Sequence, residues 1–145
     1  MEVKIKKLLE EAKIPTYAHQ SDAGMDMYAT SIVYTKDYIE YGTGISIQLP
    51  ENHVGLLFPR SSVSKYDLLL CNSVGVLDEG YLGEIKFRFK LSTNDGSFGF
   101  NNIYKILDKI GQIIILPFPK IQFVEVEELS NTERGNGGFG STDKL

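Results

Sequence analysis

The sequence predicts a single all-β domain, a distorted β-barrel or sandwich, followed by an extended glycine-rich arm. Three observations support this: segments that alternate apolar and polar residues, turn-forming clusters spaced by about 8–12 residues, and little helical periodicity. At 145 residues, 42% hydrophobic and 23% charged, the chain has the size and composition of one globular domain. With no internal repeat or linker, we place the β-barrel at residues 1–129 and the arm at 130–145.

The first half of the chain contains three informative segments. Lys4–Ala12 has some helical periodicity, but its first residues also alternate, so a helix and a strand are equally compatible with it. Gly44–Leu49 alternates apolar and polar residues and precedes a turn at Pro50–Asn52. Val54–Phe58 is an apolar segment. We therefore expect strands over Gly44–Leu49 and Val54–Phe58.

The second half adds three expected strands. Glu84–Leu91 alternates most cleanly and places Arg88 on the polar face, where a solvated strand residue is the favoured interpretation. Ile110–Leu116 is a nearly continuous apolar run, which is typical of a strand buried on both faces. Ile121–Glu127 alternates again and predicts a last strand.

Bulk composition excludes several classes of protein. A net charge of −4 argues against a general nucleic-acid-binding surface. The single Cys71 excludes an internal disulfide and a cysteine-based zinc site, and His19 and His53 are far apart in sequence. No apolar run reaches the roughly 18 residues that span a bilayer, and the N-terminus lacks a signal-peptide core. We expect a cytoplasmic protein without a membrane partner.

The arm contains the most informative motif, Arg134–Thr142. Its four glycines let backbone N–H groups approach an anion, Arg134 offers a planar fork for phosphate oxygens, and two hydroxyls follow. A disordered tail is the alternative, but it would not require an arginine, an aromatic ring and a Ser-Thr pair at this spacing. A P-loop would need a lysine where Ser141 stands and a helix after it. The motif predicts a flexible arm that covers phosphates.

Four other segments have both a structural and a functional interpretation. Asp22–Ala29 reads as a turn or a carboxylate site, and Pro59–Ser64 as a helix cap or a phosphate grip. Asn72–Glu84 reads as a β-hairpin turning at Asp78–Gly80, either as a plain turn or as a base pocket in which Asp78 holds a water. Gln112 opens an apolar run and needs a hydrogen-bond partner if it is buried.

Taken in chain order, these segments resemble the five motifs of the dUTPase family. The resemblance extends from about residue 20 to residue 142, nearly the whole chain. It implies a β jelly-roll and a homotrimer with three shared active sites, in which the arm of one subunit closes over a neighbour's site. The matching segments are Ala23–Asp26, Pro59–Ser62, Gly75–Glu84, Lys109–Gln112 and Arg134–Thr142.

The resemblance also implies an activity: cleavage of dUTP to dUMP and pyrophosphate with Mg²⁺, which keeps uracil out of DNA and supplies dUMP. By position, Asp78 is the general base that activates a water for in-line attack on the α-phosphorus. Asp26 is the outer-sphere partner of Mg²⁺, acting through water. Gln112 lies near the phosphates and completes the catalytic set.

The remaining implied roles concern substrate binding. Arg60, Ser61 and Ser62 bind the α- and β-phosphates. The arm binds the γ-phosphate through Arg134, Gly140, Ser141 and Thr142. Phe139 stacks on uracil, Tyr81 packs on the deoxyribose and excludes a 2′-hydroxyl, and the uracil edge is read by Asn72, Gly75, Val76 and Leu77. A tight pocket of this kind rejects thymine by its methyl group and cytosine by mismatched donors and acceptors.

The sequence departs from the family at four positions, and two alternative functions compete with dUTP hydrolysis. Gly80 replaces a common aspartate, Leu107 a common glycine, Gly111 a common alanine, and Asp143 stands where a glycine usually follows Ser-Thr. One alternative is a dCTP deaminase-like enzyme of the same superfamily. The other is a nucleotide-gated regulatory protein, as in some phage members, which would bind a protein partner through the site and arm.

Overall fold

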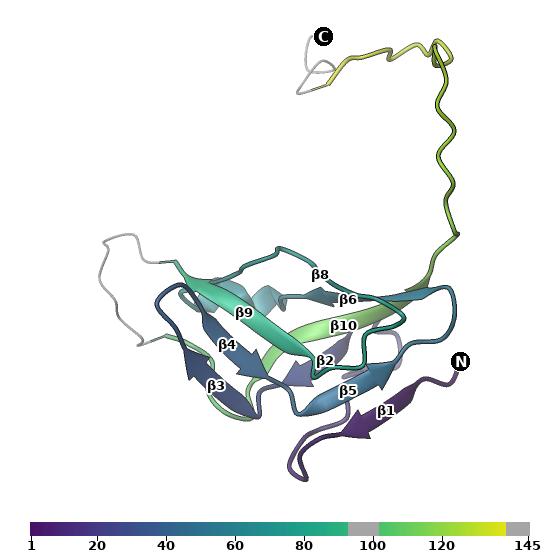
Figure 1. Ribbon diagram of the computed structural model, residues 1–145. Coiled ribbons are helices and arrows are strands. Elements are labelled where there is room, and N and C mark those ends of the chain that lie inside the picture. The colour runs from purple at the N-terminus through teal and green to yellow at the C-terminus, as the bar shows by residue number, and fades with distance from the viewer. Residues whose placement is uncertain (93–101, 139–145) are drawn as a thin grey trace.

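The computed structural model describes residues 1–92 and 102–138, and these form an all-β body from which the C-terminal segment extends (Figure 1). The described residues include one short 3₁₀ helix, Ser61–Lys65, and no helix long and apolar enough to cross a membrane. The predicted all-β jelly-roll class is therefore confirmed, although the strands do not close into a barrel.

Within the described residues, the strands form two four-stranded antiparallel sheets and one two-stranded sheet. The first sheet has the order β2 (Met25–Tyr28), β10 (Lys109–Pro117), β6 (His53–Phe58), β8 (Gly75–Leu77). The second has the order β3 (Ser31–Tyr34), β4 (Ile39–Gly42), β9 (Lys86–Leu91), β7 (Leu68–Leu70). The two-stranded sheet pairs β1 (Lys4–Lys7) with β5 (Ile45–Gln48).

Strand β10 organises the first sheet because it pairs with β2 on one side and β6 on the other. In this register Gln112 lies opposite Asp26 on β2 and opposite Phe58 on β6. Residues opposite each other in an antiparallel pair project from the same face of the sheet. Three segments far apart in the sequence therefore meet at one level of the sheet.

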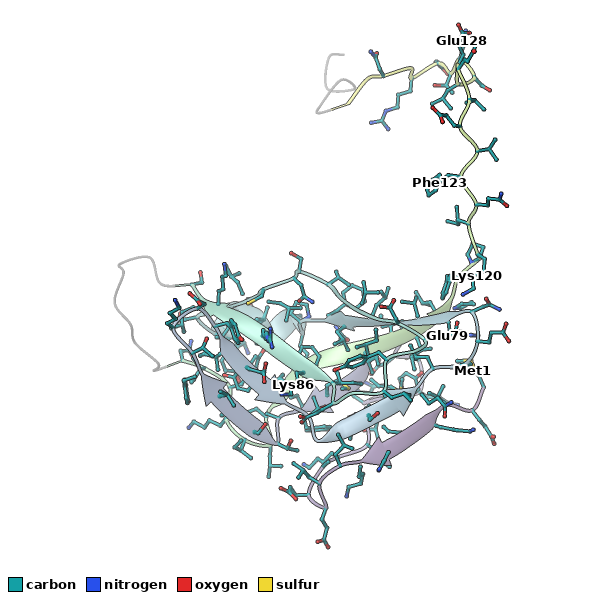
Figure 2. The ribbon with its side chains drawn as sticks, in the orientation of Figure 1. Met1, Glu79, Lys86, Lys120, Phe123 and Glu128 are labelled. Atoms are coloured by element: carbon teal, nitrogen blue, oxygen red, sulfur yellow. The ribbon has the colours of Figure 1, made fainter. Side chains whose placement is uncertain are left out.

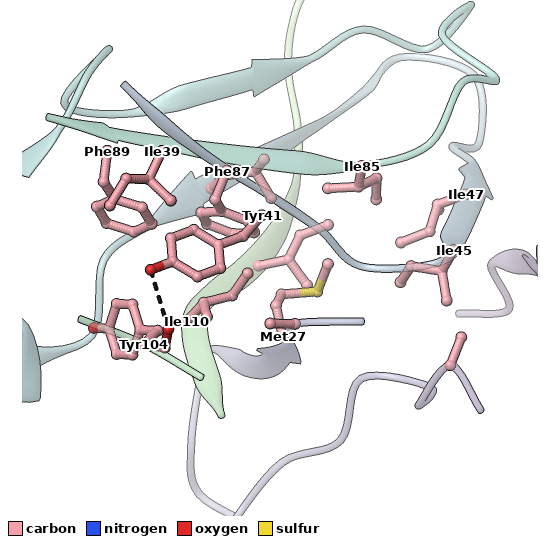
Figure 3. Close-up of a cluster of buried hydrophobic side chains, with 14 of the residues drawn as sticks. Met27, Ile39, Tyr41, Ile45, Ile47, Ile85, Phe87, Phe89, Tyr104 and Ile110 are labelled. Carbon is pink, nitrogen blue, oxygen red and sulfur yellow. Dashed lines mark hydrogen bonds between the residues drawn. The ribbon is translucent and has the colours of Figure 1, made fainter. Parts of the chain in front are cut away.

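The core between the sheets is built around aromatic side chains (Figure 3). Tyr41 makes edge contacts with Phe89 and Tyr104, at ring-centroid distances of 5.8 and 5.9 Å, and its hydroxyl donates to the Tyr104 carbonyl oxygen at 3.2 Å. Burial raises the pKa of the Tyr104 hydroxyl to about 12. The edge-to-face pairs and the hydrogen bond of the Tyr41 hydroxyl stabilise this core beyond the burial of apolar area.

The predicted strands over Gly44–Leu49, Val54–Phe58 and Glu84–Leu91 are confirmed as β5, β6 and β9. Lys4–Ala12 begins as a strand, β1, which settles that alternative. Within β9 the apolar side chains are buried and the charged ones face outward, as the alternation predicts. In contrast, β10 is not buried along both faces: Ile110 and Ile113 are fully buried, but the strand becomes exposed toward its end.

The prediction of a last strand over Ile121–Glu127 is wrong for this chain by itself. The segment belongs to no strand, and the Ile121, Phe123 and Val124 side chains are 72%, 94% and 76% exposed. It extends away from both sheets (Figure 2). A strand needs a partner ladder for its backbone groups, and the chain leaves the sheet after Phe118, whose N–H donates to the Asn52 carbonyl oxygen at 2.9 Å.

The predicted hairpin around Asp78–Gly80 is also corrected. The Tyr81 N–H donates to the Asp78 carbonyl oxygen at 3.0 Å, so a turn is present. However, β8 pairs with β6, whereas β9 pairs with β4 and β7 in the other sheet. The arm before the turn is β8, the arm after it belongs to no strand, and the turn carries the chain from one sheet to the other.

Two departures from the family pattern have structural explanations. Gly111 has no room for a side chain, because a Cβ there would lie 2.3 Å from Cε1 of the Phe87 ring and 3.0 Å from the Phe58 carbonyl oxygen. Leu107 adopts φ = 70°, in the left-handed region that favours glycine. Its N–H donates to the Ala29 carbonyl oxygen at 2.8 Å, which holds the backbone in that conformation.

We expect Leu107→Gly to stabilise the protein. A left-handed conformation costs a non-glycine residue about 1–2 kcal/mol, part of which is offset by the greater unfolded-state entropy of glycine. The Leu107 side chain is 49% exposed, so little packing is lost. Urea denaturation should show a gain of about 1 kcal/mol at unchanged m-value. Leu107→Ala keeps the Cβ and should show no gain, and an equal gain from alanine would refute the strain explanation.

Candidate active site

One candidate site lies where β2, β10 and the end of β6 meet. We call it the Asp26 cluster, and it consists of Asp26, Arg60, Ser62, Lys109 and Gln112. The Asp26 residue is only 8% exposed. Its Oδ1 lies 2.9 Å from Nε of Arg60, and its Oδ2 lies 2.6 Å from Nζ of Lys109. One carboxylate thus holds two cations, which leaves a local excess of positive charge for an anionic ligand.

Gln112 has the hydrogen-bond partner that its position in an apolar strand requires. Its Nε2 donates to the Pro59 carbonyl oxygen at 3.2 Å. A Cβ on Gly24 would lie 2.4 Å from Oε1 of Gln112, so the absence of a side chain at residue 24 makes room for the amide. The glycine before Asp26 in the sequence motif therefore has a packing role at this site.

Arg60 directs its guanidinium across the start of the 3₁₀ helix. Its Nη1 donates to Oγ of Ser62 at 3.3 Å. Arg60 occupies the N-cap position without a side-chain cap hydrogen bond, and the first helical residue is Ser61. The capping interpretation of Pro59–Ser64 is therefore wrong, and the phosphate-binding interpretation is the one that stays a prediction.

A second candidate site is a cavity of about 490 Å³ between the two sheets, beside the end of β7 and along β8. Its lining includes six residues predicted to bind the nucleoside or activate water: Asn72, Gly75, Val76, Leu77, Asp78 and Tyr81. The structure therefore gathers all the predicted members of the third motif, and the preceding asparagine, in one pocket. We call it the β8 pocket.

Tyr81 is held at the mouth of the β8 pocket by its neighbours in sequence. Its hydroxyl donates to the Glu84 carbonyl oxygen at 2.8 Å. The ring lies against Gly83, where a Cβ would come within 2.6 Å of the Tyr81 hydroxyl oxygen. By contrast, a Cβ on Gly80 would meet nothing within 4 Å. Gly83 is thus required for the position of the ring, and Gly80 is not.

The turn that carries Asp78 is anchored through Glu79 (Figure 2). Oε2 of Glu79 accepts from the Asn52 N–H at 2.9 Å and lies 3.7 Å from Nζ of Lys120. Asn52 is in the loop between β5 and β6, and Lys120 follows β10, where the C-terminal segment leaves the body. The turn is therefore tied both to the body and to the point where the C-terminal segment leaves it.

A charged cluster borders the β8 pocket where β4 pairs with β9. Oε1 of Glu40 accepts from Nζ of Lys86 at 2.8 Å, and its Oε2 accepts from Nε of Arg88 at 2.8 Å. The hydrogen bond from Lys86 lowers the pKa of the Glu40 carboxyl, with a further contribution from Arg88 and against the opposing effect of burial. The same contact raises the pKa of Lys86.

The two candidate sites do not meet within one chain. Asp26 is level with Phe58, whereas Asp78 follows Leu77, which is opposite Gly55. Along the strands Asp26 and Asp78 are four residues apart, about 13 Å, and across the sheet they are three strand spacings apart, about 14 Å. Because these two directions are perpendicular, the residues lie about 19 Å apart. The structure brings Asp26, Arg60 and Gln112 together, but it places the predicted base Asp78 elsewhere.

The described part of the arm, residues 130–138, lies apart from the sheets (Figure 1). Arg134 is in a local turn, where its Nε donates to the Gly137 carbonyl oxygen at 2.9 Å and Gly135 has φ = 52°. The predicted arm residues Phe139, Gly140, Ser141 and Thr142, and the departure at Asp143, lie outside the described residues.

Several residues of these sites were not predicted from the sequence. Cys71, Glu84, Lys86 and Arg88 also line the β8 pocket. Arg88 was interpreted as a solvated residue of the strand, and it is indeed exposed. Lys109 was part of a recognised motif but had no role assigned, and strict alternation from Gln112 would place it on the opposite face of the sheet.

An all-β fold with a cationic cluster at one end of a sheet, and at the other a pocket lined by both polar and apolar residues, has the features expected of a protein that binds a phosphorylated nucleoside. Comparison with known proteins identifies the family. The dUTPase family model matches residues 10–143, nearly the whole chain. This chain therefore belongs to the dUTPase family, the dUTP diphosphatases.

Individual relatives agree with this assignment. The deoxyuridine 5′-triphosphate nucleotidohydrolase of Clostridium kluyveri is 44% identical, with 100% of both chains covered. The structure of Staphylococcus bacteriophage 80alpha dUTPase with dUpNHpp has a TM-score of 0.80 at 29% identity, covering 97% of each chain. A dUTPase of S. aureus phage phi11, described as coordinating a structural Mg(II) ion, has a TM-score of 0.72 at 26% identity, covering 88% of this chain and 98% of that one.

The Glu40 cluster generates a prediction about pH. Because the folded-state pKa of Glu40 is below its ordinary value of 4.5, the cluster contributes stability above about pH 4.5 and loses it as pH falls through the folded-state pKa. We expect Glu40→Gln to lower the free energy of unfolding by about 1 kcal/mol at neutral pH. The difference from wild type, measured by urea denaturation between pH 7 and pH 3, should shrink at the acid end; a constant difference would contradict it.

Proposed function

We propose that this protein hydrolyses dUTP to dUMP and pyrophosphate with Mg²⁺, as a homotrimer whose active sites are shared between subunits. The observation that carries the proposal is the assembly of the motif residues into two complementary half-sites. The β8 pocket has the shape and polar groups for a nucleoside, and the Asp26 cluster has the charge for its phosphates.

Recognition of the base is assigned to the backbone of β8. Strand β8 is at the end of its sheet, so one edge of it pairs with β6 and the other is not paired with a described strand. The free N–H and C=O groups of such an edge can read the polar edge of uracil, together with the Asn72 amide. A thymine methyl would strike this backbone, and cytosine would leave donors and acceptors unpaired.

The reaction is an in-line displacement at the α-phosphorus. The Asp78 carboxylate accepts a proton from a water whose oxygen forms the new bond to the α-phosphorus, while the bond from that phosphorus to the α–β bridging oxygen breaks. Pyrophosphate leaves with the bonding electrons. Because a carboxylate is a weak base, much of the rate increase comes from positioning, from charge neutralisation by Arg60 and from a hydrogen bond donated by Ser61.

The residues of the Asp26 cluster fit a magnesium ion held mainly by the triphosphate. Among residues 1–92 and 102–138, no group of three or more His, Cys, Asp and Glu side chains gathers where it could hold a metal. Mg²⁺ binds oxygen and keeps several of its waters, and it would neutralise phosphate charge. Asp26, beside Gln112 on the next strand, is the carboxylate that would accept hydrogen bonds from those waters.

The separation of the two half-sites supports a shared site. A base must lie within about 3 Å of the proton that it removes, or one water further away, and about 19 Å separates Asp78 from Asp26 within the chain. A second chain would supply the missing half, and a third the arm with Arg134, Phe139, Gly140, Ser141 and Thr142. The exposed Phe123, at 94%, would be covered in such an assembly.

A nucleotide-gated regulatory role is the second candidate. The phage 80alpha structure is described with the statement that phage dUTPases control transfer of virulence genes by a proto-oncogenic G protein-like mechanism. A role of this kind would use the same nucleotide site and add to hydrolysis. The deaminase alternative is disfavoured, because the full-length relatives are named as dUTP nucleotidohydrolases.

We expect Asp78→Asn to lose pyrophosphate release from dUTP by at least about 100-fold, since the amide cannot accept the proton of the attacking water. Wild type should release pyrophosphate from dUTP and not from UTP, dCTP or dTTP. Calorimetry with a non-hydrolysable dUTP analogue should show that the variant still binds. Equal turnover in the two proteins would remove Asp78 from the mechanism.

We expect Gly83→Ala to weaken discrimination against a 2′-hydroxyl, because the added Cβ displaces the Tyr81 ring. The ratio of kcat/KM for dUTP over UTP should fall by about tenfold. Gly80→Ala is the matched control, since a Cβ there meets nothing within 4 Å. A similar loss in both variants would attribute the effect to the turn backbone instead of to Tyr81.

A further inference from the structure

An irregularity in β10 sets the position of Lys109. On β2, Asp26 and Tyr28 are two residues apart and share a face, but their partners on β10, Gln112 and Lys109, are three residues apart. The register shifts between Lys109 and Gly111, so β10 contains one extra residue. Without this bulge Lys109 would project from the opposite face; with it, Lys109 projects beside Asp26 and Gln112.

The bulge is held in place by the core. Ile110, the residue without a partner in the register, is fully buried. Phe87 packs against the backbone of Gly111, where even a Cβ would come within 2.3 Å of its ring. Bulges recur next to active sites, where they redirect a side chain. Here the redirected side chain reaches the carboxylate of Asp26.

The ion pair between Lys109 and Asp26 is continuous with a second ion pair, between Asp26 and Arg60. Nζ of Lys109 lies 2.6 Å from Oδ2 of Asp26, and the other carboxylate oxygen lies 2.9 Å from Nε of Arg60. With its Nε directed at Asp26, Arg60 has its terminal nitrogens left, of which Nη1 donates to Ser62. The orientation of the Asp26 carboxylate thus determines where the phosphate-binding end of Arg60 lies.

We propose that Lys109 is a positioning residue: it holds the Asp26 carboxylate, and through it the Arg60 guanidinium, in the orientation that receives the phosphates of the substrate. The inference rests on the proposed function for the identity of the substrate. A surface lysine that merely pairs with a carboxylate would require neither a bulge nor an acceptor that is 8% exposed and already paired. Lys109 therefore affects phosphate binding and not Asp78, the general base.

The test compares Lys109→Met with Lys109→Arg, and uses Lys105→Met as a matched control in the exposed preceding loop. Kinetics with dUTP give KM and kcat, and calorimetry with pyrophosphate and with deoxyuridine separates the two half-sites. Losing the ion pair should weaken pyrophosphate binding and raise KM for dUTP by about fivefold. The value of kcat should fall as well, because Arg60 also neutralises charge during the reaction. Deoxyuridine binding should not change, arginine should restore most of the loss, and Lys105→Met should behave as wild type.

A double-mutant cycle distinguishes positioning from direct contact with phosphate. If Lys109 acts through Asp26, Lys109→Met should cost nothing further in an Asp26→Asn background. If the double variant instead loses pyrophosphate affinity by the product of the two single-variant factors, the positioning role is refuted. Unchanged pyrophosphate binding in Lys109→Met would refute it as well. Lys109→Gln repeats the test should the methionine variant fold poorly. Pyrophosphate binding decides the inference even if wild type proves inactive on dUTP, which would refute the proposed function alone.

Discussion

The pairing of β10 with β2 and β6 is the constraint on which the sites depend. It sets Gln112 opposite Asp26 on one side and opposite Phe58 on the other, so that Arg60 emerges at the same level. Burial enforces this register, because a shift of one residue would expose Ile110 and Ile113 and bury polar side chains. The Asp26 cluster is thus positioned by rigid strands whose alignment the core determines.

The same sheet explains why the active site is divided. β8 pairs with the far side of β6, and Asp78 lies beyond its end, on the side away from Arg60. Within one chain the β8 pocket and the Asp26 cluster therefore lie about 19 Å apart. In the proposed trimer a second chain would complete each site, and the segment beyond Phe118 extends away from the body (Figure 2). A regulatory partner that met this segment would affect the site directly.

Local cations reconcile a chain of net charge −4 with an anionic substrate. Asp26 and Glu40 each hold two cations, the first at the phosphate end and the second beside the pocket, between β4 and β9. Positions without a side chain allow these groups to approach: Gly24 makes room for Gln112, and Gly83 for Tyr81. Charge and close packing, more than overall composition, define where a nucleotide can bind.

The sequence alone determined the all-β class, the strands with clear alternation and the motif residues, because these depend on local pattern and residue chemistry. Only the tertiary structure decided which strands pair. The expected hairpin at Asp78–Gly80 joins two sheets, Ile121–Glu127 forms no strand in the isolated chain, and Lys109 reaches Asp26. Each outcome depends on partners distant in sequence: a ladder needs a second strand, and a bulge is visible only against the strand that it faces.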